Sequence, residues 1–182
     1  MNTASKCEEP DLSSSFALWI FFSKDNYIMK ASEYETNLKK ITDIEDIYQF
    51  WDVYQHLQRP SLLPQNCEVF FFKNDIKPVW ESKHNRGGGK FVIRPKKNIV
   101  DQVWEQLLIE SLYYENPLFC GIDLSTKRNE ISIWTRELEY YSQKEDFKNW
   151  ICSVLGFPAK MYLEYKDHPL TEDVSVLDKD GD

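Results

Sequence analysis

A tryptophan followed at once by a glutamate, Trp80-Glu81, is the pair in this chain whose possible chemistry is easiest to specify. The electron-rich face of a Trp ring attracts a ring that carries delocalised positive charge, and a Glu carboxylate accepts hydrogen bonds from N–H donors. A positively charged purine needs both groups. The Gly-rich basic stretch Arg86-Gly87-Gly88-Gly89-Lys90 follows closely, so the region is a candidate nucleotide-binding site. The alternative is structural, a buried Trp beside a surface Glu.

Residues that would support catalysis are sparse. The three histidines are isolated from one another, and no Ser or Cys stands in a recognisable nucleophile motif. The four cysteines form no Cys-x-x-Cys pair, which argues against a zinc site and against a redox motif. The run from Gly87 to Lys90 resembles a phosphate loop, but His84 and Phe91 stand where the Walker A motif requires a Gly and a Ser or Thr. We therefore expect no enzymatic activity, no metal and no cofactor, and an enzyme acting on a nucleotide is the weaker alternative.

The distribution of charge favours a small anionic ligand. The net charge of −8 argues against general binding of nucleic-acid backbones, which depends on a basic excess. Residues 80–100 nevertheless contain six basic residues and one acidic residue. A local basic patch in an acidic protein suits a small anionic group better than a long polyanion.

Seven segments rich in β-branched or aromatic residues are predicted strands. They are Phe16–Phe22, Glu35–Ile41, Cys67–Lys73, Lys90–Arg94, Phe119–Leu124, Glu130–Thr135 and Lys160–Tyr165. The polar turn Lys127-Arg128-Asn129 joins the fifth and sixth of them into a hairpin. The tip of this hairpin is therefore cationic.

Three helices are predicted, and two of them carry a capping-box pattern at their start. The box Thr42-Asp43-Ile44-Glu45 begins the first helix and Ser142-Gln143-Lys144-Glu145 begins the third, while Asn98 with Asp101 begins the middle one. The middle and third helices have apolar residues at helical spacing on one side. The third is predicted to end at Gly156.

The first helix carries more apolar surface than packing on a core requires. At about 100° per residue, its apolar side chains between Ile44 and Leu57 cover roughly 220° of the circumference, against the ~100° stripe of a core-facing helix. An exposed apolar patch usually marks a protein partner. Coverage by flanking loops is the alternative.

The chain is predicted to be one domain of residues 15–168, between an N-terminal tail of residues 1–14 and an acidic C-terminal tail of residues 169–182. No apolar run approaches the roughly 18 residues of a membrane span, and the sequence shows no signal peptide. We expect a monomer without membrane contact, in the cytoplasm or also in the nucleus.

An ordered set of motifs runs along most of the chain, from about Phe16 to Tyr165. Its pieces are Ala17-Leu18-Trp19 with Phe21-Phe22, Asn37-Leu38, Ile47 to Trp51 with Tyr54 and His56, Pro78-Val79-Trp80-Glu81, Gly88-Gly89, Cys120-Gly121 and Ile131-Ser132-Ile133-Trp134. Together they resemble the translation initiation factor 4E family, whose members bind the 7-methylguanosine cap of mRNA.

The resemblance implies an α+β fold and a cap pocket. The fold would be a single domain in which a curved antiparallel sheet of about eight strands carries three helices on its convex face. The methylated base would lie between Trp80 and Tyr34, Glu81 would accept hydrogen bonds from the guanine N1 and N2 donors, and Trp134 would lie against the N7-methyl group. Methylation makes the guanine positive, which adds a cation–π component that plain guanine lacks.

The same resemblance assigns the cap phosphates to cations on the hairpin that precedes Trp134. Lys127 aligns with an arginine of the family, and Arg128 is a neighbour that could replace the second cation, because Glu130 stands where a lysine often sits. Lys90 is a further candidate from the Gly-rich side. These departures from the family pattern affect the expected phosphate contacts and leave the expected recognition of the base unchanged.

Two aromatic substitutions indicate the family's divergent second class, which includes the 4E homologous protein. Tyr34 and Phe16 stand where the main initiation factor has Trp. Tyr stacks with less area and a weaker quadrupole than Trp, which predicts a lower cap affinity. Both roles stay open, in translation initiation and in its repression.

The exposed arc of the first helix also acquires a function from the resemblance. In the family this surface docks the Tyr-x-x-x-x-Leu-Φ helix of a 4G-type scaffold factor or of an inhibitory 4E-binding protein. Ile47 and Trp51 occupy the contacting positions, and Ile109 aligns with a third apolar contact. The predicted partners are thus capped mRNA and such a protein. The alternative is a protein-interaction domain of the same fold with weak or lost cap binding.

Overall fold

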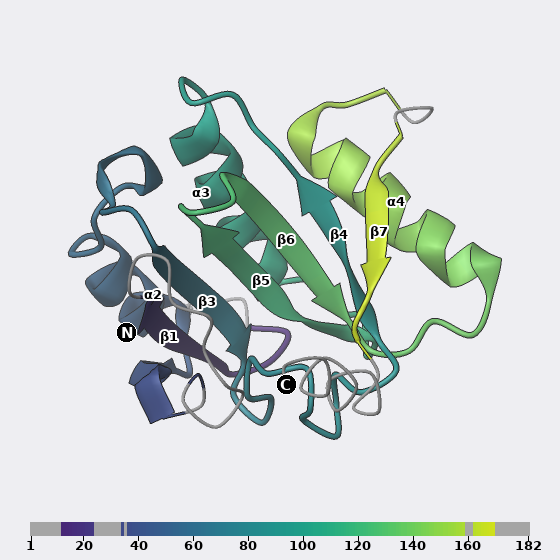
Figure 1. Ribbon diagram of the computed structural model, residues 1–182, viewed down its shortest axis with the longest axis horizontal. Helices are drawn as coiled ribbons and strands as arrows, with labels where there is room; N and C mark the ends of the chain where they lie inside the picture. Colours follow the sequence, from purple (N-terminus) through teal and green to yellow (C-terminus); the bar gives the residue numbers. More distant parts are fainter. Residues whose placement is uncertain (1–11, 24–33, 35, 159–161, 170–182) are drawn as a thin grey trace, which may run out of the picture.

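Seven strands form one antiparallel sheet in the computed structural model, which describes residues 12–23, 34, 36–158 and 162–169 (Figure 1). The order across the sheet is β2-β1-β3-β5-β6-β4-β7. The strands are β1 Phe16–Phe22, β2 Lys39–Ile44, β3 Cys67–Lys73, β4 Gly89–Ile93, β5 Phe119–Ser125, β6 Glu130–Thr135 and β7 Glu164–Asp167.

Three longer helices lie on one side of this sheet (Figure 1). They are α2 Ile47–Tyr54, α3 Val100–Leu112 and α4 Tyr141–Leu155, and a short 3-10 helix, η1, spans Pro60–Leu62. The helices and the antiparallel sheet confirm the predicted α+β fold class. The seven strands of the described residues are close to the predicted number of about eight.

The main core lies between the sheet and the helices. Side chains of a strand alternate between the two faces, and the residues that face the helices are almost all apolar. They include Leu18, Phe71, Phe91, Ile122 and Ile133, each at most 3% exposed. A second apolar cluster lies on the opposite face, which we call the front face, and contains Phe21, Leu38, Phe70, Phe72, Ile76, Cys120 and Trp134.

The start of the first helix differs from the prediction. Asp46, not Thr42, is the N-cap of α2, and Asp46 Oδ1 accepts a hydrogen bond from the Gln49 backbone N at 2.8 Å. Thr42 lies in β2, a strand that begins at Lys39 and not at residue 35 as predicted. The strand starts later because Thr36 and Asn37 are helical.

The other two helices also begin with different contacts. The N-cap of α3 is Ile99, without a side-chain cap, and Asp101 accepts from the Ser61 backbone N at 2.8 Å instead. The N-cap of α4 is Tyr140, whose backbone N donates to Gln143 Oε1 at 3.0 Å, so the predicted box at Ser142 is wrong. Gly156 ends α4 in the left-handed region at a φ of 64°, as predicted.

The last strand and the tails are only partly covered by the described residues. Strand β7 spans Glu164–Asp167, whereas residues 160–161 of the predicted strand lie outside the described part of the chain. Residues 1–11 and 170–182, which make up most of the two predicted tails, lie outside it too.

Candidate functional site

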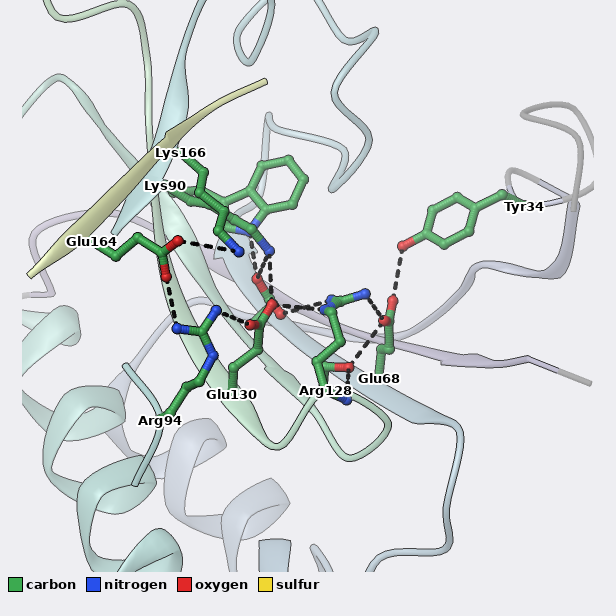
Figure 2. Close-up of polar contacts among 11 residues, drawn as sticks. Tyr34, Glu68, Lys90, Arg94, Arg128, Glu130, Glu164 and Lys166 are labelled. Carbon is green, nitrogen blue, oxygen red and sulfur yellow. Dashed lines mark hydrogen bonds and ion pairs between the residues drawn. The ribbon is translucent and has the colours of Figure 1, made fainter. Parts of the chain in front are cut away.

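A group of charged side chains lies on and beside the front face of the sheet, and we call it the ion cluster (Figure 2). Strand alternation directs Glu68 of β3, Asp123 of β5 and Glu130 of β6 to this face. These acids pair with three cations. Lys90 lies in β4, Arg94 follows the end of β4, and Arg128 lies in the turn between β5 and β6. The ion cluster consists of Glu68, Lys90, Arg94, Asp123, Arg128 and Glu130.

Arg128 bridges the three carboxylates of the ion cluster. Its Nη1 lies 2.8 Å from Glu68 Oε1, and its Nε donates to Glu130 Oε1 at 2.7 Å. Its Nη2 lies 3.8 Å from Asp123 Oδ2. Figure 2 shows Arg128 between Glu68 and Glu130. The side chain predicted to bind a phosphate is therefore already held by acids.

Lys90 and Arg94 complete the ion cluster. Lys90 Nζ lies 3.5 Å from Glu130 Oε1 and 3.8 Å from Asp123 Oδ1. Arg94 Nη2 lies 3.3 Å from Glu130 Oε2, and its Nη1 donates to Glu164 Oε2 at 2.7 Å. Glu130 thus receives all three cations of the cluster.

Burial and pairing act in opposite directions on the pKa values of Glu68 and Glu130. Glu68, Asp123 and Glu130 are 8%, 0% and 3% exposed. Burial raises the pKa of Glu68 above its usual range, although Arg128 opposes the shift. Burial also works to raise the pKa of Glu130, but Lys90 and Arg128 outweigh it, and the pKa is lowered. Of Glu68 and Glu130, Glu130 is therefore the one that the cations hold more firmly in its charged form.

Trp134 is fixed beside the ion cluster. It is 7% exposed, and its indole Nε1 donates to Asp123 Oδ1 at 2.5 Å. Its ring centroid lies 4.3 Å from that of His168 and 5.8 Å from Lys90 Nζ. An indole held by a buried carboxylate keeps one orientation, as a wall of a ligand site requires.

Tyr34 is also tied to the ion cluster. Its ring packs on Phe21 with 4.3 Å between centroids, and its hydroxyl donates to Glu68 Oε2 at 3.4 Å. Burial and the negative charge of Glu68 raise the pKa of the phenol. Among the described residues Tyr34 makes no ring contact with Trp80, so the two predicted sandwich residues are not stacked on each other.

Trp80 and Glu81 lie in the loop between β3 and β4, where Trp80 is exposed and Glu81 is half-buried. Trp80 is 41% exposed. The Glu81 carboxylate has neither a hydrogen bond nor an ion pair with any described residue. The fully buried Asn85 holds the loop, because its Nδ2 donates to the Lys77 and Val79 carbonyls at 2.9 and 2.8 Å. The loop therefore offers the Trp80 ring and the unpaired Glu81 carboxylate to a ligand, on a backbone that the Asn85 hydrogen bonds hold in place.

Comparison with known proteins identifies the family. The family model described as eukaryotic initiation factor 4E matches residues 11–176. The chain is 35% identical to the translation initiation factor NCBP of Oryza sativa over 159 residues, covering 84% of this chain and 69% of that protein. It is 30% identical to translation initiation factor 4E of Xenopus laevis over 167 residues, with 86% and 76% covered.

The chain belongs to the eukaryotic initiation factor 4E family. Solved structures agree on the fold: eIF4E-3 of C. elegans, in complex with the 4E-binding protein Mextli and cap analog, superimposes with a TM-score of 0.77 at 24% identity. The alignment covers 91% of this chain and 95% of that one. A Schistosome eIF4E complexed with m7GpppA and 4E-BP gives 0.75 at 20% identity, with 94% and 93% covered.

The helical back of this family member exposes part of its apolar arc, as the sequence predicted. Trp51 is 44% exposed and Tyr48 is 60% exposed, both on α2. Ile47 and Ile109 are partly buried against the core. Trp51 contacts Phe50 edge-on with 5.1 Å between ring centroids. Part of the apolar arc of α2 is therefore exposed, with Trp51 in it, and the role of this surface in partner binding stays a prediction.

Several residues of the front face had no role in the sequence analysis. Glu68 and Asp123 hold Tyr34, Arg128 and Trp134 in place, and Asn85 pins the Trp80 loop. An acid inside an otherwise apolar strand was the available signal for Glu68 and Asp123, because a buried charge requires a partner. Lys127 is exposed at the hairpin tip and makes no ion pair with the described residues.

The part of the chain that the structure describes offers neither a metal site nor a membrane-spanning helix. They contain no group of three or more His, Cys, Asp or Glu side chains placed to hold a metal ion. Within the same ranges, no helix has the length and apolar character needed to cross a membrane.

Proposed function

We propose that this protein binds the 7-methylguanosine 5′ cap of mRNA and docks a protein partner on its helical back, acting in translation initiation or in its repression. The observation that carries cap binding is the Trp80-Glu81 loop. It offers an exposed indole and a carboxylate that no described residue uses. Membership of the initiation factor 4E family supports the same conclusion.

The chemistry of each residue fits a methylated guanine. The Trp80 face attracts the positive charge that N7-methylation places on the ring. Glu81 can accept from two parallel N–H donors in a charge-assisted pair. Tyr34 supplies a second aromatic face, and the fixed Trp134 indole closes the side toward the methyl group. The protein would then distinguish the methylated guanine from plain guanine by its positive charge.

The proposed docking surface for the protein partner is the apolar arc of α2 together with Ile109 of α3. A half-exposed Trp such as Trp51 is a typical anchor for an amphipathic helix that lies in a groove. Such a partner would carry the Tyr-x-x-x-x-Leu-Φ pattern. Two of the structural neighbours are complexes with a 4E-binding protein or 4E-BP, which supports this choice.

A second candidate function is a protein-interaction domain with weak or lost cap binding. The observation that favours it is the position of Tyr34, which is packed on Phe21 and hydrogen-bonded to Glu68. Stacking on a base would have to compete with these contacts. The affinity for the cap decides between the two functions.

Titration of the protein with 7-methyl-GTP and with GTP, followed by quenching of tryptophan fluorescence, tests cap binding. We expect 7-methyl-GTP to bind at least tenfold more tightly, and equal affinities would refute the proposal. Glu81→Ala should lose at least tenfold in affinity for 7-methyl-GTP, because a charge-assisted pair is worth about 1.5–3 kcal/mol. Its stability should stay within about 0.5 kcal/mol of the wild type, since this carboxylate has no described partner. The control is Glu45→Ala, an exposed Glu at the start of α2.

A further inference from the structure

The ion cluster on the front face is neutral as a group. It contains three carboxylates, of Glu68, Asp123 and Glu130, and three cations, of Lys90, Arg94 and Arg128. Two of these cations, Lys90 and Arg128, are residues that the family resemblance offered as candidates for the cap phosphates. Every cation of the cluster has a carboxylate oxygen within 3.5 Å.

We propose that this protein recognises the methylated guanine almost independently of the number of phosphates attached to it. The inference rests on the proposed cap binding and names the class of ligand more closely. 7-Methylguanosine 5′-monophosphate is expected to bind nearly as well as the triphosphate. The residue that sets this preference is Glu130, which receives Lys90, Arg94 and Arg128.

The first reason is the cost of releasing a paired cation. Arg128 makes a 2.7 Å contact with Glu130 and a 2.8 Å contact with Glu68, and both acids are less than one tenth exposed. If Arg128 turned to a phosphate, Glu68 would lose the one cation that pairs with it among the described residues, and Glu130 would keep only Lys90 and Arg94. Taking the cation from a buried carboxylate is unfavourable, although the Arg128 side chain is itself 44% exposed and water can solvate it. The new phosphate contact would therefore be offset by the contact that it replaces.

The second reason is that the same carboxylates repel a phosphate that approaches without displacing them. Glu130 and Asp123 lie 3.5 and 3.8 Å from Lys90 Nζ. A phosphate close to Lys90 thus comes close to two negative charges in a site that is poorly screened by water. The attraction of the one cation and the repulsion of the acids largely cancel.

The third reason is that the cations of the Trp80 loop and of the hairpin tip are exposed. Lys83 and Arg86 in the Trp80 loop and Lys127 at the hairpin tip are exposed. They differ from Arg94 and Arg128, which are also exposed, in that no buried acid of the described residues holds them. Ion pairs on the surface gain little because water and salt screen them. These residues can draw an anionic ligand toward the site, but they distinguish weakly between one phosphate and three.

The wild-type protein tests the inference directly. The affinities of 7-methylguanosine mono-, di- and triphosphate are measured by tryptophan fluorescence in magnesium-free buffer at constant pH and near-physiological salt. We expect the triphosphate to bind less than about tenfold more tightly than the monophosphate, and a larger ratio overturns the inference. The 7-methyl-GTP affinity should also fall less than about threefold between 50 and 300 mM salt. A steeper loss would show that unpaired cations carry the binding, which overturns it as well.

Glu130→Gln tests the assigned residue, because it removes one negative charge and leaves the neutral ion cluster with a net charge of +1. We expect the triphosphate-to-monophosphate ratio to rise at least fivefold, and an unchanged ratio in the folded variant overturns the role of Glu130. Glu130→Asp, which keeps the carboxylate, should restore a ratio close to that of the wild type. Asp43→Asn is the matched control, since it removes an exposed acid paired with Lys40 outside the cluster.

The outcomes separate this inference from the proposed function. Equal affinities for 7-methyl-GTP and GTP refute cap binding and the inference together. A clear preference for the methylated nucleotide, combined with a phosphate ratio above tenfold, refutes the inference alone. If Glu130→Gln does not fold, the wild-type phosphate series and salt series still decide the question.

Discussion

Tyr34 and Glu68 are joined by a hydrogen bond in which the Tyr34 hydroxyl donates to Glu68 Oε2 over 3.4 Å. Glu68 also pairs with Arg128 at 2.8 Å. One carboxylate therefore links the aromatic residue predicted to stack on the base with a cation of the hairpin. A Trp has no hydroxyl to make this contact, so Tyr at this position has a structural consequence beyond its smaller stacking area.

Substitutions at Tyr34 separate the ring from the hydroxyl. Tyr34→Phe should bind 7-methyl-GTP within about fivefold of the wild type, because it keeps the ring and loses one hydrogen bond of about 1 kcal/mol. Tyr34→Ala should lose about tenfold or more, because the cation–π contact disappears. Fluorescence titration measures both, with Tyr113→Ala as a control for removing a half-exposed Tyr elsewhere. Wild-type affinity of Tyr34→Ala would exclude Tyr34 from the site.

Trp51 offers a test of the helical surface that leaves the front face untouched. Trp51→Ala should cost about 1–1.5 kcal/mol of unfolding free energy, because the side chain is 44% exposed and full burial of a large apolar side chain is worth about 1.5–3 kcal/mol. Binding of a synthetic Tyr-x-x-x-x-Leu-Φ peptide, measured by fluorescence anisotropy, should weaken by about thirtyfold or more if Trp51 is a hot spot. Tyr140→Ala, which removes a 63% exposed Tyr at the start of α4, should leave peptide binding unchanged. Equal peptide affinities of Trp51→Ala and the wild type would move the docking surface away from α2.

Element bounds were predicted best from the sequence where the local hydrophobic pattern and the tertiary packing favour the same element. The bounds of β1, β3 and β6 match their predictions to the residue, because each strand is a compact run of apolar or alternating residues between polar turns. The predicted N-caps of the three helices were wrong. Thr42 and Asp46 both precede a Glu or Gln by three residues, and only the extent of β2 shows that Asp46 is the cap.

The ion cluster shows what the sequence could not predict. Glu68 and Asp123 lie in different strands, and each reads as an isolated acid in an apolar segment. Only the strand order, with β5 between β3 and β6, brings Glu68, Asp123 and Glu130 within reach of Arg128. The resemblance gave the correct fold and named Arg128 as a phosphate ligand, but it could not show that three acids hold this side chain.

Two glycines predict a contrast in stability. A Cβ on Gly121 would lie 2.5 Å from Phe72 Cγ and 2.6 Å from the Phe71 carbonyl oxygen, both within the sheet. A Cβ on Gly156 would meet nothing within 4 Å, although its φ of 64° disfavours other residues. Gly156→Ala should therefore cost about 1 kcal/mol, and Gly121→Ala should cost several times more because backbone must move. Urea denaturation of the two variants measures the difference, and equal losses would contradict the close packing of Gly121.

His168 predicts a loss of stability in mildly acidic solution. Its ring is buried against Trp134, and its Nε2 has no hydrogen-bond partner among the described residues. Burial, with the positive charge of Lys90, lowers the pKa of His168 from 6.5 to about 4. Between these values the imidazole of the unfolded chain binds a proton and that of the folded chain does not. The contribution of neutral His168 is therefore complete above pH 6.5 and is lost as the pH falls toward 4.

A His168→Gln variant isolates this contribution from that of the carboxylates, which titrate in both proteins. The free energy of unfolding is measured by urea denaturation of both proteins at several pH values from 7.5 to 4. Between pH 7 and pH 4 the wild type should lose on the order of 2 kcal/mol more than the variant, since each unit of pKa shift corresponds to about 1.4 kcal/mol. Parallel curves for the two proteins would mean that His168 takes up its proton in the folded state as readily as in the unfolded one.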